Sequence, residues 1–260
     1  MKETIVTIMI TFLALTSCAK SEKAVPIVSL ETPPPSKVTP VKIVILLDKS
    51  GSAPDHAVPQ INVDDLQPLI GFLTTRGGEL AIGEISSKVH RPLIRLRVDN
   101  VPPPPPIKPA PLGNAFRDAD AAEDYRIRIT SHQAETAKFN AEVDRIRDIF
   151  IRDVMPLAMQ KAEAKKTDIW GALRQSDLFL MEAESATPIR RYLLLLTDGK
   201  DTAGGYPVAQ LKSQPKMLLV NSSASDGVLA RFDPLKFESF AAAVRFIIHD
   251  KNGGKDANKK

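Results

Sequence analysis

The sequence predicts an α/β fold: a doubly wound, mostly parallel sheet with helices on both faces and a long helical insertion. Two runs, 41–47 and 191–197, are almost continuously apolar, which is typical of strands covered on both faces. Helical and strand patterns alternate around them, as expected for helices wrapped over a parallel sheet. The 260 residues, 43% of them hydrophobic, suffice for one good-sized domain or a domain with extensions.

Residues 1–17 have the pattern of an export signal: Lys2 near the start, then an apolar stretch, 5–15, that is too short to cross a membrane. The segment ending at Cys18 reads Leu-Thr-Ser-Cys and resembles the lipobox of bacterial lipoproteins, in which the cysteine is acylated. An ordinary signal peptide that contains a cysteine is the alternative. Cys18 is the single cysteine of the chain, so it has no disulfide partner within it, which favours lipidation.

Acylation of Cys18 implies a bacterial cell-envelope protein held at the membrane by acyl chains. Ala19, not aspartate, follows the cysteine, and the sorting rule of Gram-negative lipoproteins then favours the outer membrane, if the organism has one. Residues 18–40 are rich in proline and predict an extended tether. Residues 251–260 are rich in lysine and predict a disordered tail.

The elements of the domain follow from hydrophobic spacing. Apolar residues three and four apart predict helices, and short apolar or alternating runs predict strands. A run that contains Pro92 is expected at an edge of the sheet, because proline cannot donate to a ladder. In chain order the sequence predicts strand 41–47, helix 64–76, strand 79–85, edge strand 89–98, helix 169–183, strand 191–197, strand 216–220 and helix 237–248.

An insertion of about 100–166 separates the third strand from the helix at 169. It starts with a proline-rich run that includes 102–106 and predicts polyproline II, either a rigid spacer or a ligand for an aromatic groove. A charged stretch, 114–166, follows, with apolar residues at helical spacing. It predicts one long helix or two helices broken near Pro156, acting as an enlarged structural helix or as a partner-binding arm.

The candidate site begins where the first strand ends. Asp48, Ser50 and Ser52 follow the apolar run at every second position, and ligand sites in such sheets lie beyond the carboxyl ends of the strands. Side chains that offer only oxygen suit a hard cation such as Mg²⁺.

The D-x-S-x-S pattern resembles the first segment of a von Willebrand factor type A domain, whose metal-ion-dependent adhesion site is completed by a threonine and a second aspartate. Thr167 opens a segment similar to the family's threonine loop, and Asp198 closes a segment similar to its fourth-strand signature. The resemblance covers 41–250 apart from the insertion. Lys166 before the threonine departs from the glycine that is frequent there.

The resemblance implies a metal site of Asp48, Ser50, Ser52, Thr167 and Asp198, holding Mg²⁺ or alternatively Mn²⁺ or Ca²⁺. The serines would bind the ion directly, the threonine directly or through water, and the aspartates partly through water. An open position would accept a carboxylate from a protein partner. The competing interpretations are local: the serines as helix caps and Asp198 in an ordinary turn.

The leading hypothesis is a membrane-anchored binding module, not an enzyme, that captures a protein partner through the cation. The alternative is a scaffolding lipoprotein that binds through its helical insertion and keeps a vestigial metal site. An envelope hydrolase is the third class, but the chain has no G-x-S-x-G or H-E-x-x-H motif, and its four histidines lack metal-ligand spacing. Basic and acidic residues are interspersed without a basic stripe, which argues against nucleic acid as a partner.

Overall fold

A computed structural model describes residues 39–50, 61, 63–87, 91–160, 166–182, 188–220 and 227–250. The predicted signal segment, Cys18 and the tether up to residue 38 lie outside these residues, as does the predicted tail. The secondary structure elements, in chain order, are β1 Val41–Asp48, α1 Val63–Arg76, β2 Gly78–Ile85, β3 Ile94–Val98, α2 Ala115–Met159, α3 Ile169–Met181, β4 Arg190–Leu196, β5 Lys216–Val220, the 3₁₀ helix η1 Gly227–Phe232, β6 Leu235–Phe237 and α4 Phe240–His249.

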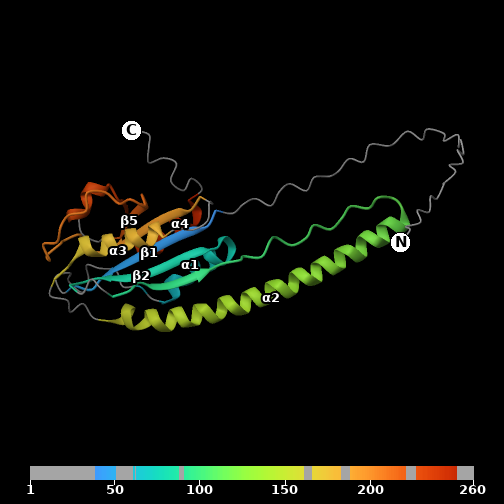
Figure 1. The fold of residues 1–260 in the computed structure, drawn as a ribbon, viewed down its shortest axis with the longest axis horizontal. Helices are drawn as coiled ribbons and strands as arrows, with labels where there is room; N and C mark the ends of the chain where they lie inside the picture. Colours follow the sequence, from blue (N-terminus) through green and yellow to red (C-terminus); the bar gives the residue numbers. More distant parts are fainter. Residues whose placement is uncertain are drawn as a thin grey trace, which may run out of the picture. The chain divides into compact units, whose positions relative to one another are not determined.

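The six strands form one sheet in the order β3-β2-β1-β4-β5-β6. β1 lies in the middle and pairs in parallel with both β2 and β4; β5 and β6 continue the parallel sheet. The exception is β3, which pairs with β2 in the antiparallel direction at the edge (Figure 1). All eight residues of β1 are buried, as its near-continuous apolar sequence predicts for a central strand.

Helices cover both faces of the sheet. Alternate residues of β1 point to opposite faces: Ile43 and Ile45 pack in the cluster that contains α1, α2 and α4, whereas Val44 and Leu46 pack in the cluster that contains α3 and η1. These two layers and the sheet order confirm the predicted fold class, a mostly parallel α/β sheet with a long helical insertion.

Helix α2 is a single helix of 45 residues with Pro156 inside it, which resolves the question the sequence left open. Proline removes one backbone N–H and disturbs the turn before it, and here only three helical residues follow it, so little helix is left to lose. At the other end Asn114 caps the helix, because its side chain accepts from the N–H groups of Phe116 and Arg117 at 3.1 and 3.3 Å.

The two halves of α2 have different surroundings. The C-terminal half contributes Val143, Phe150, Val154 and Leu157 to the core, whereas no residue from 115 to 138 is buried. The proline-rich segment 101–112 lies beside this N-terminal half (Figure 1), and His132 Nε2 is 2.8 Å from the carbonyl oxygen of Pro103. We call residues 101–138 the arm.

The two parts of the arm, the proline-rich segment and the helical segment, have similar lengths. An extended proline-rich segment rises about 3.1 Å per residue, so residues 101–112 span about 37 Å. A helix rises 1.5 Å per residue, so residues 115–138 span about 36 Å. The extended segment is therefore about as long as residues 115–138 of the helix beside it.

Several predicted boundaries were wrong. The third strand begins at Ile94, after Pro92, and not at residue 89. The last helix begins at Phe240, where the Ser239 hydroxyl accepts from Ala242 N–H at 3.2 Å, and Phe237 belongs to β6.

Candidate metal centre

The candidate centre lies at the carboxyl edge of the sheet, where β1 and β4 end side by side. These strands are parallel and in register from Val41 with Arg190 to Leu47 with Leu196. Asp48 is the last residue of β1, and Asp198 follows β4 by two residues. The parallel pairing therefore brings to one edge two carboxylates that are 150 residues apart in the sequence.

Asp48 is buried, with 4% of its surface exposed, and hydrogen bonds hold both of its carboxylate oxygens. Oδ1 accepts from the N–H of Ser50 at 2.9 Å, and Oδ2 accepts from the hydroxyl of Thr197 at 2.6 Å. Burial raises the pKa of Asp48 above its usual value; hydrogen bonds from Ser50 and Thr197 oppose the rise, and the negative charge of Asp198 adds to it. The charge of Asp198 thus acts on Asp48 across the gap between the strands.

Asp198 is also buried, with 2% exposed. Its Oδ1 accepts from the N–H of Lys200 at 2.9 Å. Its Oδ2 is buried and, among the described residues, accepts no hydrogen bond; the exposed ammonium of Lys200 forms an ion pair with it at 3.6 Å, too long for a hydrogen bond. Burying an anionic oxygen without a donor is costly, so this oxygen is suited to a cation.

Thr167 is fully buried and belongs to a loop that is bound to the segment following Asp198. Its N–H donates to the Thr202 hydroxyl at 2.8 Å, and its carbonyl oxygen accepts from the N–H groups of Thr202 and Ala203, each at 3.0 Å. Backbone hydrogen bonds therefore hold the threonine loop against the loop of the second aspartate.

Two further aspartates, Asp168 and Asp201, stabilise this arrangement. Asp168 caps α3 by accepting from Gly171 N–H at 2.7 Å. Asp201 accepts from Ile169 N–H at 3.1 Å and also from Ala203 N–H at 3.1 Å. Both carboxylates are engaged with backbone donors at the N-terminus of α3, where negative charge is favourable.

The predicted ligands thus fall into three groups. Asp48, Ser50 and Asp198 are buried at the same edge of the sheet, and the loop of Thr167 is joined to that edge. Ser52 lies outside the described residues. The coordination of a cation by these side chains stays a prediction, as does the placement of the Thr167 hydroxyl among the ligands.

The chemistry of the donors fits Mg²⁺ better than a soft metal. No group of three or more His, Cys, Asp or Glu side chains that could hold a metal occurs in the described part of the chain. A cation at this edge would depend on two carboxylates and on hydroxyl oxygens, which are hard ligands. Two carboxylates balance the charge of one divalent ion.

Sequence reasoning missed Thr197 and Lys49. The Thr197 hydroxyl accepts from Gly199 N–H at 3.1 Å while it donates to Asp48, so it links the two aspartate loops. Its position between the last apolar residue of β4 and Asp198 was the available signal. Lys49 lies inside the D-x-S-x-S pattern, and its ammonium donates to the carbonyl oxygens of Ala158 and Gln160 at the end of α2; the sequence holds no signal for that contact.

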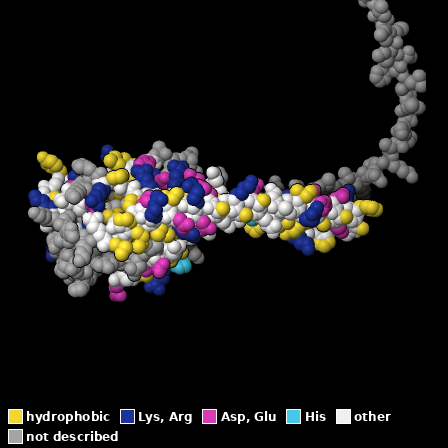
Figure 2. All heavy atoms as spheres, turned by 90° about the horizontal axis from the view of Figure 1, so that it is seen from below, with side chains coloured by type: hydrophobic (Ala, Val, Ile, Leu, Met, Phe, Trp, Pro, Cys, Tyr) yellow, Lys and Arg dark blue, Asp and Glu magenta, His cyan; other side chains and the backbone are white. Residues whose placement is uncertain are grey.

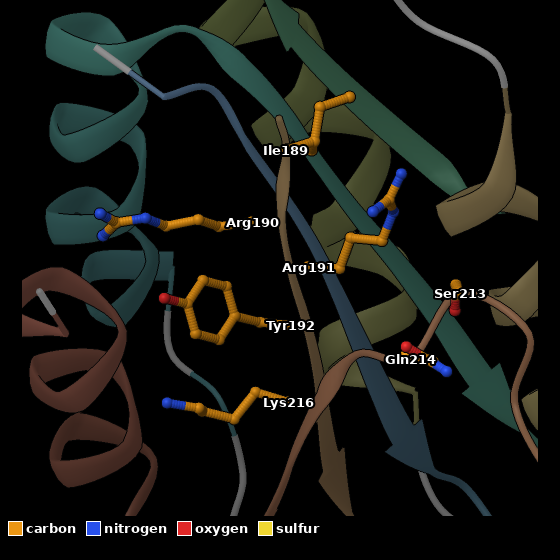
Figure 3. Close-up of a pocket in the computed structure, with 7 residues that line it drawn as sticks. All are labelled: Ile189, Arg190, Arg191, Tyr192, Ser213, Gln214 and Lys216. Atoms are coloured by element: carbon orange, nitrogen blue, oxygen red, sulfur yellow. The ribbon is translucent and has the colours of Figure 1, made fainter. Parts of the chain in front are cut away.

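A pocket lies at the opposite end of β4, lined by Ile189, Arg190, Arg191, Tyr192, Ser213, Gln214 and Lys216. Figure 3 shows Arg190, Tyr192 and Lys216 extending to one side of the strands and Arg191 to the other. Asp250 accepts from Tyr192 at 3.1 Å and from Lys216 at 2.8 Å. Burial raises the pKa of Tyr192 to about 12. These groups pair with one another, so the pocket offers an outside ligand less unpaired charge than the sheet edge does.

The comparisons with known proteins identify no family. No family model matches the chain, and no curated protein matches it. Among solved structures, one similar chain is proximal thread matrix protein 1 from the mussel byssus, with 12% sequence identity and a TM-score of 0.38. The match covers 81% of this chain and 47% of the mussel chain, so it spans about half of that protein's length.

Proposed function

We propose that this chain is a cell-envelope lipoprotein whose α/β domain, similar to a von Willebrand factor type A domain, binds a protein partner through a divalent cation. The supporting observation is the pair of buried carboxylates, Asp48 and Asp198, at one edge of the sheet. One oxygen of Asp198 accepts no hydrogen bond from a described residue. Such a pair repels when both groups are ionised, and a divalent cation removes the repulsion.

In this proposal Asp48, Ser50, Thr167 and Asp198 hold Mg²⁺, or alternatively Mn²⁺ or Ca²⁺, together with Ser52. The bound ion supplies an electrophilic position for a carboxylate of the partner. The side chain of Lys200 is 63% exposed beside Asp198 and adds positive charge at the same edge. Both features favour an acidic group on the partner.

The membrane part of the proposal depends on Cys18 and on the tether, which are argued from the sequence alone. Acyl chains on Cys18 would anchor the protein, at the outer membrane if the organism is Gram-negative. In the described part of the chain, no helix combines the length and the apolar character needed to cross a membrane.

We propose binding and not catalysis. An enzyme that used Asp48 would resemble the dehalogenase-type hydrolases, in which a second aspartate two residues later serves as the acid or base. Here that position is Ser50, whose N–H donates to Asp48. Both oxygens of Asp48 accept hydrogen bonds, which holds this carboxylate in one orientation and suits a ligand better than a nucleophile.

Isothermal titration of Mg²⁺ into the purified protein tests the proposal. We expect saturable binding in the wild type and none in Asp48→Ala. Glu84→Gln is a matched control: Glu84 lies at the same end of β2, carries the same charge and is not a proposed ligand. Equal heats for wild type and Asp48→Ala would refute the cation site.

The arm supports a second candidate, a scaffolding lipoprotein that binds through its insertion. Hydrophobic side chains are exposed along the arm and at its far end (Figure 2). Within the arm, Ile107, Leu112 and Phe116 are 79%, 66% and 86% exposed. Exposed apolar groups of this size are typical of interaction sites when they cluster. Replacing these three residues by serine should abolish partner capture if the protein binds through its insertion. If the protein binds through the cation, the same variant should keep its EDTA-sensitive capture of the partner.

A further inference from the structure

The C-terminal end of α2 is bound by a side chain from the candidate metal motif. Lys49 lies between Asp48 and Ser50, and its ammonium donates to the carbonyl oxygen of Ala158 at 2.9 Å and to that of Gln160 at 2.9 Å. Its own N–H donates to Ile85 O at 3.1 Å. Residue 49 therefore joins the end of β1 to β2 through its backbone and to α2 through its side chain.

The helix needs a cation at this end. The last carbonyl groups of a helix have no partner within it and carry partial negative charge. The last turn of α2 contains no basic residue, so the helix does not neutralise its own C-terminus. Lys49, 109 residues away from Ala158 in the sequence, supplies the missing charge.

The same end of α2 is also close in the chain to another proposed ligand. Six residues separate Gln160 from Thr167. A shift of the last turn of α2 would act through Lys49 on the loop of Asp48 and Ser50.

A second contact at this end of α2 does not involve the metal motif. Arg91 Nη1 lies 3.3 Å from the side-chain oxygen of Gln160 and 3.2 Å from Glu84 Oε2. Because Arg91 holds the same helix end without touching a proposed ligand, it provides a control for effects on helix stability alone.

We propose that Lys49 is a positioning residue that couples the last turns of α2 to the cation site. The inference rests on the proposed function of that site. Cation binding should then order the end of α2, and anything that displaces this helix end should change cation affinity. If a ligand on the arm displaces it, that ligand should change cation affinity by the same factor by which the cation changes the affinity for the ligand, because coupling between two binding events is reciprocal.

The test combines Mg²⁺ titration with amide hydrogen exchange on the full-length protein. We expect Lys49→Met to weaken Mg²⁺ affinity by roughly 5-fold or more, the lower range of measured site-to-site couplings. Mg²⁺ should slow exchange at residues 150–160 in the wild type but not in Lys49→Met. Lys49→Arg, which keeps the charge, should recover part of both effects. Arg91→Met removes a contact of the same helix end without touching the loop of Asp48 and Ser50, so it should weaken Mg²⁺ affinity less than Lys49→Met does.

The failures can be told apart. If the wild type binds no Mg²⁺, the proposed function itself is wrong. If the wild type binds Mg²⁺ and Lys49→Met binds it equally well, the coupling is wrong and Lys49 is only a helix cap. If Lys49→Met does not fold, exchange in the wild type decides, because Mg²⁺ that leaves residues 150–160 unchanged also overturns the coupling.

Discussion

Asp198 is a buried carboxylate whose two oxygens have unequal hydrogen bonding in the described structure. One oxygen accepts the Lys200 N–H, and the other is buried without a hydrogen bond from a described residue. The charge of Asp198 also raises the pKa of Asp48, whose burial is the larger cause. A carboxyl group with a raised folded-state pKa destabilises the ionised native protein, and this penalty disappears as the pH falls from the folded pKa toward the unfolded value.

Asp198→Asn should therefore stabilise the cation-free protein. Asparagine keeps an oxygen for the Lys200 N–H and removes the charge that acts on Asp48. At pH 7 in EDTA we expect the free energy of unfolding to rise by at most about 1 kcal/mol, because burial and not Asp198 is the main cause of the raised pKa of Asp48. The gain should shrink as the pH falls through the folded pKa of Asp48, where protonation relieves the same repulsion. Urea unfolding with and without EDTA measures it.

The same variant should lose stabilisation by Mg²⁺, because the neutral amide is a poor replacement for a carboxylate ligand. Lys200→Met is the control, since it removes the neighbouring ammonium and leaves both carboxylates. Wild-type stabilisation by Mg²⁺ in Asp198→Asn would contradict the role of this residue.

At this scale the sequence predicted residues that end strands, and it could not predict contacts made across the fold. Asp48 and Asp198 were found because each closes an apolar run. Thr197 donates to Asp48 across 149 positions, and Lys49 reaches Ala158 across 109. Such contacts depend on which strand and helix ends meet, and the residue types alone do not determine that.

Lys42, at the other end of β1, is a second lysine whose contact with a helix end could not be predicted from the sequence. Its ammonium donates to Phe179 O at 3.1 Å and to Glu182 O at 3.3 Å, at the C-terminus of α3. Helix α3, like α2, has no basic residue in its last turn. The need for a cation at each helix end could be read from the sequence, whereas the lysine that supplies it could not.

Among the elements, α2 is the one whose role the sequence left most open. Its C-terminal half belongs to the core, because Phe150 and Val154 pack with residues of the sheet and of α1. Deleting the whole insertion would therefore remove core side chains together with the arm. A test of the arm must leave this half of the helix intact.

Phe150→Ala should destabilise the protein by about 3–5 kcal/mol, the usual cost of removing a buried phenylalanine, because only 2% of Phe150 is exposed. The neighbouring Ile149 is 38% exposed, so Ile149→Ala should cost much less. Thermal or urea unfolding measures both. Similar, small losses for the two variants would mean that α2 is an appendage of the domain and not part of its core.

The boundaries of the elements were less predictable than their order. Apolar spacing identified most of the strands and helices, but it joined Phe237 to the last helix because that residue fits the helical spacing. In the fold Phe237 pairs with Val220 in a three-residue edge strand. Pairing with β5 places Phe237 in a strand and not in the helix. A three-residue strand is too short to show an alternating pattern in the sequence.

Across the whole domain, α2 links parts of unequal stability. Its C-terminal half is fixed by four buried side chains and by Lys49, whereas its N-terminal half is packed against the proline-rich segment without a fully buried residue. Segments that bury little apolar surface open locally at lower free energy than the core does. One continuous helix should therefore contain two regions that unfold separately.

Amide hydrogen exchange should show this division. We expect residues 115–136 to exchange by local opening, at free energies below that of global unfolding, and residues 143–157 to exchange only with the sheet. Phe150→Ala should then accelerate exchange in the second region and leave the first unchanged, because local opening of the arm does not depend on the core. Equal protection along the whole of α2, or equal acceleration in both regions, would mean that the arm unfolds together with the domain. In that case a ligand at its tip would be coupled to the global stability of the protein.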